Sequence, residues 1–175
     1  MQNGKKALLV IDMLKDFLDP DGKLYCGDNS REIIPYVQNL VESFKIAGYD
    51  VLFICDSHDE NDIEFEKFPA HCVQETDGAQ VIEELNGYVD GNIIRKARYS
   101  AFYNTKLEKL LKKGNYEEVH VVGVCTNICV MYTVEELCNR DINTIVHIKG
   151  VQSFDSEAHK FALQQMKYVL GAKVV

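Results

Sequence analysis

Short continuous apolar runs recur along the chain, and most of them end at a charged or polar residue. Runs of this length without polar alternation are typical of strands that are buried on both faces of a sheet. We therefore expect strands at residues 7–11, 51–55, 93–96, 119–122 and 142–148, and a sixth at 172–175.

Between these runs, apolar residues recur at three- and four-residue spacing, which is typical of amphipathic helices. The first expected helix starts at Ser30 as its N-cap and ends at Gly48. Because strands and helices alternate, we predict an α/β fold in which a mostly parallel sheet of about six strands carries helices on both faces. The other helices are expected at residues 79–86, 104–113 (ended by Gly114), 127–139 and 155–168.

The 175 residues suit a single domain spanning 1–175, and 46% hydrophobic with 26% charged residues is ordinary globular composition. The net charge of -8, with scattered Lys and Arg, argues against a nucleic-acid partner. No apolar run reaches the ~18 residues of a membrane span, and the N-terminus lacks a signal-like segment, so we expect a cytoplasmic protein without membrane contacts. In a reducing compartment, the six cysteines are not expected to form a disulfide framework. Several lie in apolar runs, where core thiols are common, and a catalytic or metal-bound cysteine is the functional candidate.

Polar residues stand where several predicted strands end: Asp12, Asp56, Lys96 and the segment 123–129. Ligands of open parallel sheets bind outside the carboxyl ends of the strands, so these residues are the first candidates for a site. Cys129 is the candidate nucleophile, because the N–H groups in the first turn of a helix lower a thiol pKa and can form an oxyanion hole. Asp12 is the candidate base for the thiol proton, and Lys96 the cation that stabilises negative charge.

Each of these residues also has a purely structural interpretation. Cys129 fits a small core thiol, Asp12 a turn cap and Lys96 a solvated strand end. Cys125 and Cys129 lie close enough in sequence to leave open a redox pair or a metal site. The spacing is not Cys-x-x-Cys, however, and no second pair completes a zinc site.

A long polar segment, residues 57–78, follows the second predicted strand, and such loops are usually functional in small domains. Asp56 and His58 place two ligands on the same side of an extended segment, and His71 in the same loop can close a site. Two histidines with a carboxylate suit Zn, Fe or Mn, and Glu64 is an additional oxygen donor nearby. Surface histidines in a polar loop are the alternative. The remaining histidines are interpreted as structural: His120, His147 and His159.

Aromatic residues lie close in sequence to these polar groups, at Phe17, Phe68, Tyr99, Phe102 and Tyr103. Aromatic walls beside a few placed polar groups are typical of a pocket for a flat small molecule. Taken singly, each of these residues also fits an ordinary core position.

Five stretches follow one another in a specific order and spacing: Leu8–Phe17, Asp56–His58, Phe68–Gln74, Lys96–Phe102 and Gly123–Val130. In this combination the chain resembles the isochorismatase-like cysteine hydrolases, and within that family the nicotinamidase (pyrazinamidase) group. The resemblance covers nearly the whole chain. It implies hydrolysis of nicotinamide to nicotinate and ammonia through a cysteine thioester, as part of NAD salvage, with nicotinamide as the partner and a homo-oligomer as a weaker expectation.

The resemblance also implies roles for single residues. It makes Asp12, Lys96 and Cys129 a catalytic triad, and the N–H groups of Cys125 and Cys129 an oxyanion hole that follows a cis peptide between Val124 and Cys125.

For the cofactor, the resemblance implies a divalent metal, zinc foremost with Fe or Mn as alternatives, on Asp56, His58 and His71. Glu64 is at a position that serves as a further ligand in some members. The residues implied to line the pocket for the pyridine ring are Phe17, Phe68 and Tyr99.

The chain departs from the family pattern at several positions. Cys125 stands where Ala is common, Asn127-Ile128 replace Asp and an aromatic residue, Phe68 replaces Trp, and Glu75 replaces Gly. These changes bear on substrate preference more than on chemistry, because Cys125 still supplies its backbone N–H. Three alternatives stay open: an amidase for another small amide or ureido compound, a catalytically silent binding partner, and a redox protein.

Overall fold

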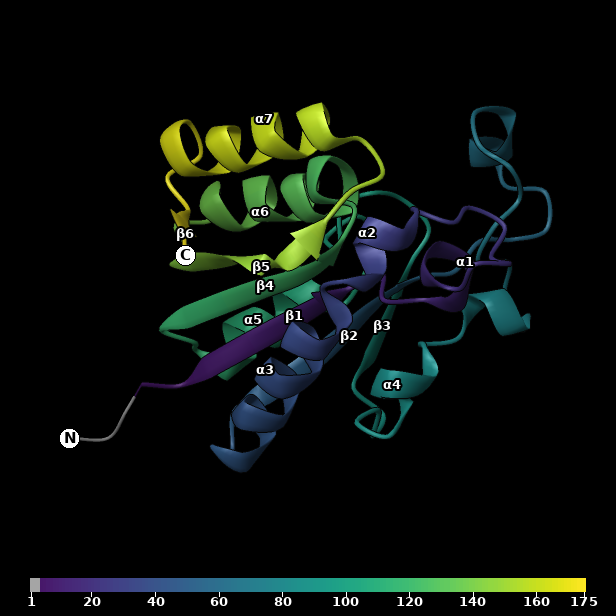
Figure 1. Ribbon diagram of the computed structural model, residues 1–175. Helices are drawn as coiled ribbons and strands as arrows, with labels where there is room; N and C mark the ends of the chain where they lie inside the picture. Colours follow the sequence, from purple (N-terminus) through teal and green to yellow (C-terminus); the bar gives the residue numbers. More distant parts are fainter. Residues whose placement is uncertain (1–3) are drawn as a thin grey trace.

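The structure, a computed structural model, describes residues 4–175, which form a six-stranded sheet with helices on both faces (Figure 1). All neighbouring strands are parallel, in the order β3-β2-β1-β4-β5-β6. This confirms the predicted α/β class and the sixth strand. The strands are β1 (Lys6–Ile11), β2 (Asp50–Asp56), β3 (Ile93–Lys96), β4 (Glu118–Val124), β5 (Thr144–Gln152) and β6 (Lys173–Val174).

The helices lie in the connections between the strands, because a chain that forms parallel strands must cross back to the same end of the sheet before each new strand. They are α1 (Lys15–Leu18), α2 (Asp28–Arg31), α3 (Ile34–Ile46), α4 (Glu83–Asn86), α5 (Leu107–Gly114), α6 (Met131–Cys138) and α7 (Ser156–Tyr168). Short 3-10 turns at Ile63–Glu66 and Asp77–Ala79 and a π turn at Thr126–Val130 complete the elements. The longest helices in this part of the chain, α3 and α7, have 13 residues each, and no helix of residues 4–175 is long and apolar enough to cross a membrane.

The predicted helix after Ser30 is two helices, and the prediction that Ser30 is its N-cap is wrong. Ser30 lies inside α2, where its buried hydroxyl donates to the Cys26 carbonyl (2.9 Å). The second helix, α3, has Pro35 in its first turn. Proline has no N–H to continue a preceding helix, so a new helix starts there.

Other boundaries differ for local reasons. Of the predicted helix 79–86 only Glu83–Asn86 is α-helical, and the predicted helix 104–113 begins at Leu107 and includes Gly114, with Asn115 as its left-handed cap. The helix expected from residue 127 begins at Met131, after the π turn. β5 runs on to Gln152 beyond the end of its apolar run, through an irregular pairing with β4.

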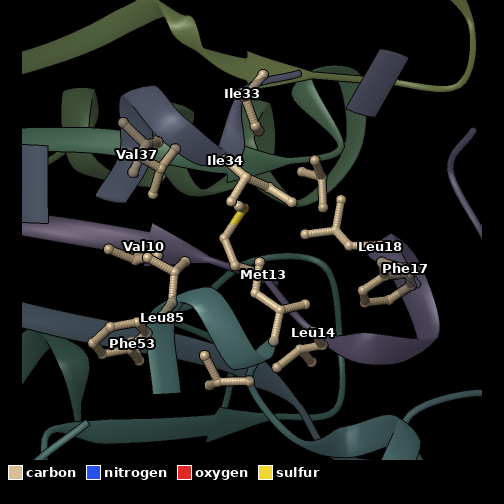
Figure 2. Close-up of a cluster of buried hydrophobic side chains, with 14 of the residues drawn as sticks. Val10, Met13, Leu14, Phe17, Leu18, Ile33, Ile34, Val37, Phe53 and Leu85 are labelled. Atoms are coloured by element: carbon tan, nitrogen blue, oxygen red, sulfur yellow. The ribbon is translucent and has the colours of Figure 1, made fainter. Parts of the chain in front are cut away.

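The core consists of two layers because alternate strand residues face opposite sides of the sheet. Leu8, Val10 and Phe53 face the side covered by α3 and α4, and Leu9 and Ile54 face the side covered by α5, α6 and α7. Figure 2 shows the first layer, where residues just beyond β1 pack against the start of α3. The residues that follow β1 in this layer are Met13, Leu14, Phe17 and Leu18, and they meet Ile33 and Ile34.

The strand order changes direction between β1 and β4, which lie side by side although β2 and β3 come between them in sequence. In open α/β sheets a crevice forms at this reversal, outside the carboxyl ends of the two strands. Asp12 directly follows β1 and Cys125 directly follows β4. The long segment after β2 also projects beyond this edge of the sheet, beside α1 (Figure 1).

Gly123 is required where β4 passes closest to β1. Its φ is +123°, and a Cβ there would lie 1.9 Å from the Ile11 carbonyl oxygen. We expect Gly123→Ala to lower the free energy of unfolding by ~3 kcal/mol, measured by urea denaturation. Gly48→Ala is the matched control, since Gly48 also has a positive φ (+73°) but no atom within 4 Å. It should cost only ~1 kcal/mol of backbone strain, and equal losses in the two variants would contradict the steric explanation.

Candidate active site

The candidate residues at the strand ends lie next to one another. Asp12 follows β1, Asp56 ends β2, Lys96 ends β3, and Cys129 lies in the turn after β4. Asp56 and Lys96 are register partners, and the Asp12 carboxylate accepts a hydrogen bond from the Asp56 N–H (2.9 Å). The structure therefore brings together at one edge the residues that the sequence placed there only by topology.

The Lys96 ammonium group is the centre of this cluster. It is fully buried and lies 2.8 Å from Asp12 Oδ2 and 3.5 Å from Cys129 Sγ, and it also donates a hydrogen bond to Asp56 Oδ1. This excludes the solvated strand end as an interpretation of Lys96, whose side chain has no exposed surface. A buried ammonium needs such partners, because an unpaired charge in the interior is very costly.

The buried charges shift one another's proton affinities. Burial and the neighbouring Asp56 raise the pKa of Asp12 to about 6, although Lys96 opposes the shift. For Asp56, burial is outweighed by Lys96 and His58, which lower its pKa. For Lys96, burial is outweighed by the two carboxylates, which raise its pKa far above the usual range. At neutral pH, Asp12 is therefore a carboxylate with a raised proton affinity, as a general base requires.

Cys129 lies in the π turn rather than in the first turn of an α-helix, and the expected lowering of its thiol pKa is wrong. Burial raises the pKa of Cys129 well above the ordinary value, although Lys96 opposes the shift. The resting side chain is consequently a neutral thiol, and a base is needed to ionise it. Asp12 Oδ2 faces this region and has no hydrogen-bond partner among residues 4–175 apart from its ion pair with Lys96.

The turn that carries Cys129 is built on the Cys125 carbonyl, which accepts hydrogen bonds from the N–H groups of Ile128 (3.0 Å) and Val130 (3.3 Å). The peptide bond between Val124 and Cys125 is cis. Side chains from the residue just after β5 and from α7 hold the turn from outside. Thr126 Oγ1 lies 2.8 Å from His159 Nδ1, and Ser153 Oγ donates to Asn127 Oδ1 (2.6 Å).

Asp56, His58 and His71 form a second buried cluster beside the first. Asp56 Oδ2 lies 3.7 Å from His58 Nε2 and 3.9 Å from His71 Nε2, while Asp56 Oδ1 accepts from Lys96. One ligand atom of each residue lies within 4.8 Å of the other two. His58 Nε2 is buried without a hydrogen-bond partner among residues 4–175. A buried orphan lone pair facing a carboxylate and a second imidazole fits a bound divalent cation.

The other ring nitrogen of each histidine has an acceptor. His71 Nδ1 lies 2.7 Å from the Pro69 carbonyl oxygen, and His58 Nδ1 lies 3.1 Å from Asp62 Oδ2. When Nδ1 donates, the lone pair is on Nε2, the nitrogen that faces Asp56 in both rings.

Sequence reasoning missed Asp62. Its carboxylate is nearly buried and is held in place by Arg98 Nη1, at 3.0 and 2.9 Å from the two oxygens. In the sequence, Asp62 is one of several carboxylates between His58 and His71, and nothing distinguishes it from Asp59.

Glu64 is buried in the wall of the same cavity, but its oxygens do not join the group of three ligand atoms within 4.8 Å. Burial and the nearby Asp56 raise the pKa of Glu64. The structure thus places Glu64 next to the ligand set rather than in it.

A cavity of about 350 Å³ opens onto both clusters, and its walls are mainly apolar. All three predicted wall residues, Phe17, Phe68 and Tyr99, line it, whereas Phe102 and Tyr103 do not. Further wall residues come from three separate segments that no local pattern connects. These are Leu24, Tyr25, Cys26, Val124, Cys125, Ile128 and Phe154.

The remaining histidines have structural contacts, as the sequence suggested. His120 Nδ1 lies 2.8 Å from His147 Nε2, and His147 Nδ1 lies 2.9 Å from the Tyr36 hydroxyl, between the sheet and α3. Burial lowers the pKa of His147 to about 4, so this chain of rings is neutral near pH 7.

The fold and the site together define a class of protein: a parallel α/β domain with a buried Cys–Asp–Lys cluster and an adjoining two-histidine, one-carboxylate group. Residues 6–175 match the family model described as the Isochorismatase domain. The chain therefore belongs to the isochorismatase family.

Similar proteins have been named or solved in several organisms. The chain is 38% identical to the "Uncharacterized isochorismatase family protein PncA" of Bacillus subtilis, over 97% of this chain and 98% of that protein. A crystal structure of nicotinamidase/pyrazinamidase PncA from Bacillus subtilis aligns with a TM-score of 0.92 at 35% identity, covering 98% of this chain and 99% of the other. The pyrazinamidase of Pyrococcus horikoshii in complex with zinc aligns with a TM-score of 0.89 at 32% identity, covering 98% of each chain.

Removing the Lys96 charge should destabilise the fold, because two buried carboxylates would lose their counter-ion. In the presence of a chelator, we expect Lys96→Met to lower the free energy of unfolding by ~3–5 kcal/mol. Adding Asp12→Asn to that variant should restore part of the loss, since one uncompensated charge disappears. Lys112→Met, which removes an exposed lysine, should cost at most ~0.5 kcal/mol. A double variant less stable than Lys96→Met would contradict this account.

Proposed function

We propose that this protein is a nicotinamidase that hydrolyses nicotinamide to nicotinate and ammonia through a thioester on Cys129. The observation that carries the proposal is the meeting of two buried clusters on one carboxylate, Asp56, at the wall of one apolar cavity. The cavity suits a flat aromatic amide, and the candidate nucleophile Cys129 and two of the candidate metal ligands, Asp56 and His71, line its wall. The similarity to proteins named nicotinamidase and pyrazinamidase supports the same substrate.

The first step in this proposal is the activation of the thiol. Asp12 takes the proton from Cys129 Sγ, and Lys96 stabilises the resulting thiolate from 3.5 Å. The thiolate then attacks the amide carbon of the substrate. The raised pKa of Asp12 makes it a strong enough base to accept the proton while it remains ionised at neutral pH.

The second step is the collapse of the tetrahedral intermediate. The N–H groups of Cys125 and Cys129 hold its oxyanion, and such a donor contributes ~3–4 kcal/mol in hydrolases of known mechanism. Protonated Asp12 returns its proton to the leaving ammonia. A water molecule, deprotonated by the same carboxylate, then hydrolyses the thioester and releases nicotinate.

Asp56, His58 and His71 would hold a divalent metal, with zinc as the first candidate because its usual ligands are nitrogen and carboxylate oxygen. Glu64 would join them after a change of rotamer. When bound, the ion would supply a positive charge and Lewis acidity beside the ring pocket. Phe17, Phe68 and Tyr99 would orient the ring against it.

The proposal extends to the setting of the enzyme. We place the reaction in the cytoplasm, in NAD salvage, with nicotinamide as the partner and no nucleic acid or membrane. A homo-oligomer is the expected assembly, by the resemblance alone.

The proposal is tested by ammonia release from nicotinamide with the metal-replete protein. We expect turnover by the wild type and a loss of about 10⁴-fold or more in kcat for Cys129→Ala, which lacks the nucleophile. Cys138→Ala is the matched control, because Cys138 is a half-buried thiol at the end of α6, away from the cavity. It should retain wild-type activity.

Two results would contradict the proposal. Equal activity of wild type and Cys129→Ala would exclude the thioester. Absence of ammonia release from nicotinamide would exclude this substrate, and the protein should then be assayed with other small amides and ureido compounds. If Cys129 also fails to react with an alkylating reagent, a catalytically silent relative is the remaining alternative.

Asp62 is expected to position His58 for metal binding. Asp62→Asn should weaken zinc binding by ~10–100-fold, as for other partners of metal-bound histidines, when affinity is measured by competition with a chromophoric chelator. Asp59→Asn is the same chemical change on an exposed carboxylate of the same segment and should leave the affinity unchanged. Equal affinities for the two variants would show that Asp62 has no such role, whatever the activity.

A further inference from the structure

Two cysteines that the proposed chemistry does not use as thiols lie side by side in the cavity wall. Cys26 Sγ is 3.3 Å from Cys125 Sγ, and both residues are buried and line the cavity. Cys26 lies between α1 and α2, while Cys125 directly follows β4. The sequence left open a pair of Cys125 with Cys129, but the thiol that the structure places in contact with Cys125 is Cys26.

We propose that Cys26 and Cys125 are a covalent modification site, at which a small disulfide compound converts the two thiols into a reversible Cys26–Cys125 disulfide that inactivates the enzyme. Among residues 4–175 the structure shows no other pair of cysteine sulfurs in hydrogen-bond contact. The inactivation rests on the proposed function, whereas the formation of the disulfide does not.

The geometry favours this bond. A disulfide has a sulfur–sulfur distance of about 2.05 Å, so the two thiols must approach each other by only about 1.2 Å. The bond would close a very long loop between residues that are far apart in the sequence, and a cross-link of that kind constrains the unfolded chain strongly. Both cysteines line the cavity and are otherwise nearly buried, so the cavity is the route by which a small reagent would reach them.

The chemistry is a thiol–disulfide exchange in two steps. The thiolate of one cysteine attacks a sulfur of the reagent, which breaks the reagent's disulfide bond and forms a mixed disulfide. The thiolate of the other cysteine then attacks the protein sulfur of the mixed disulfide and expels the second reagent sulfur. The protein loses two electrons and two protons, and the reagent gains both and leaves as two thiol groups.

The bond would disturb the active site through backbone connections. The Cys125 N–H is a proposed oxyanion donor, and the Cys125 carbonyl supports the turn that carries Cys129. Cys26 is anchored on the other side, by a hydrogen bond from its N–H to the Phe17 carbonyl (2.9 Å). Drawing the two sulfurs together therefore moves the oxyanion site relative to the ring pocket. A misplacement of about 1 Å is worth ~10²-fold in rate, which is the expected loss.

The test uses the cyclic disulfide of dithiothreitol, mixed with the reduced form at a series of ratios. This reagent oxidises paired thiols and leaves a lone thiol such as Cys129 reduced, because its mixed disulfides revert by ring closure. After alkylation of the remaining thiols, digestion without reductant and mass spectrometry identify the linked peptides. We expect a Cys26–Cys125 linkage in the wild type, and a fall of about 10²-fold in the kcat of the oxidised fraction that reduced dithiothreitol reverses.

The variants separate the possible outcomes. Cys26→Ala should form no linkage and, relative to its own reduced form, lose no activity, while Cys138→Ala should behave as the wild type does. Absence of the linkage at every ratio overturns the proposal. A linkage that leaves the activity unchanged overturns its inactivating role. If the reduced wild type does not hydrolyse nicotinamide, the proposed function fails, and the mass spectra still decide whether the site exists.

Discussion

The buried ammonium of Lys96 is the interaction on which the rest of the site depends. It contacts the carboxylates of Asp12 and Asp56 and the thiol of Cys129, which lie at the ends of β1 and β2 and just after β4. A buried carboxylate without a counter-ion would be very costly in free energy. Because the ammonium compensates both carboxylates only in part, Asp12 retains a raised proton affinity while Asp56 remains ionised. The same pairing that makes the charges tolerable therefore also gives the two aspartates different proton affinities, as the proposed roles of base and metal ligand require.

Asp56 couples this cluster to the histidines. One of its oxygens accepts from Lys96, and the other faces the Nε2 atoms of His58 and His71. A change in the charge at the histidine cluster therefore alters the charge that Lys96 and Asp12 experience, and the Cys129 cluster and the candidate metal site form one electrostatic unit. Among residues 4–175, His58 Nε2 has no hydrogen-bond partner and both Nδ1 atoms have acceptors, so the two imidazoles are oriented with Nε2 towards Asp56.

The errors of sequence-based prediction in this chain have local physical causes. The helix expected from residue 30 is divided at Pro35, and the helix expected from residue 127 is preceded by a π turn, which a period of 3.6 residues does not reveal. The pKa of Cys129 was expected to fall because helix N-termini favour thiolates. In the structure, burial raises the pKa of Cys129, the carboxylates of Asp12 and Asp56 add to this shift, and the opposing effect of Lys96 is smaller. Burial depends on the packing of distant segments, and no spacing of residues reports it.

By itself, the sequence determined the strands, the α/β class and the residues at the strand ends, because apolar runs and the polar residues that end them are local properties of the chain. It could place Asp12, Asp56, Lys96 and Cys129 on one edge of a parallel sheet, but not in contact. Only the tertiary structure decided that β1 lies beside β4, that Asp56 serves two clusters, that Asp62 holds His58, and that Cys26 touches Cys125. These contacts join segments far apart in the chain, and the order in which strands pair decides which segments meet.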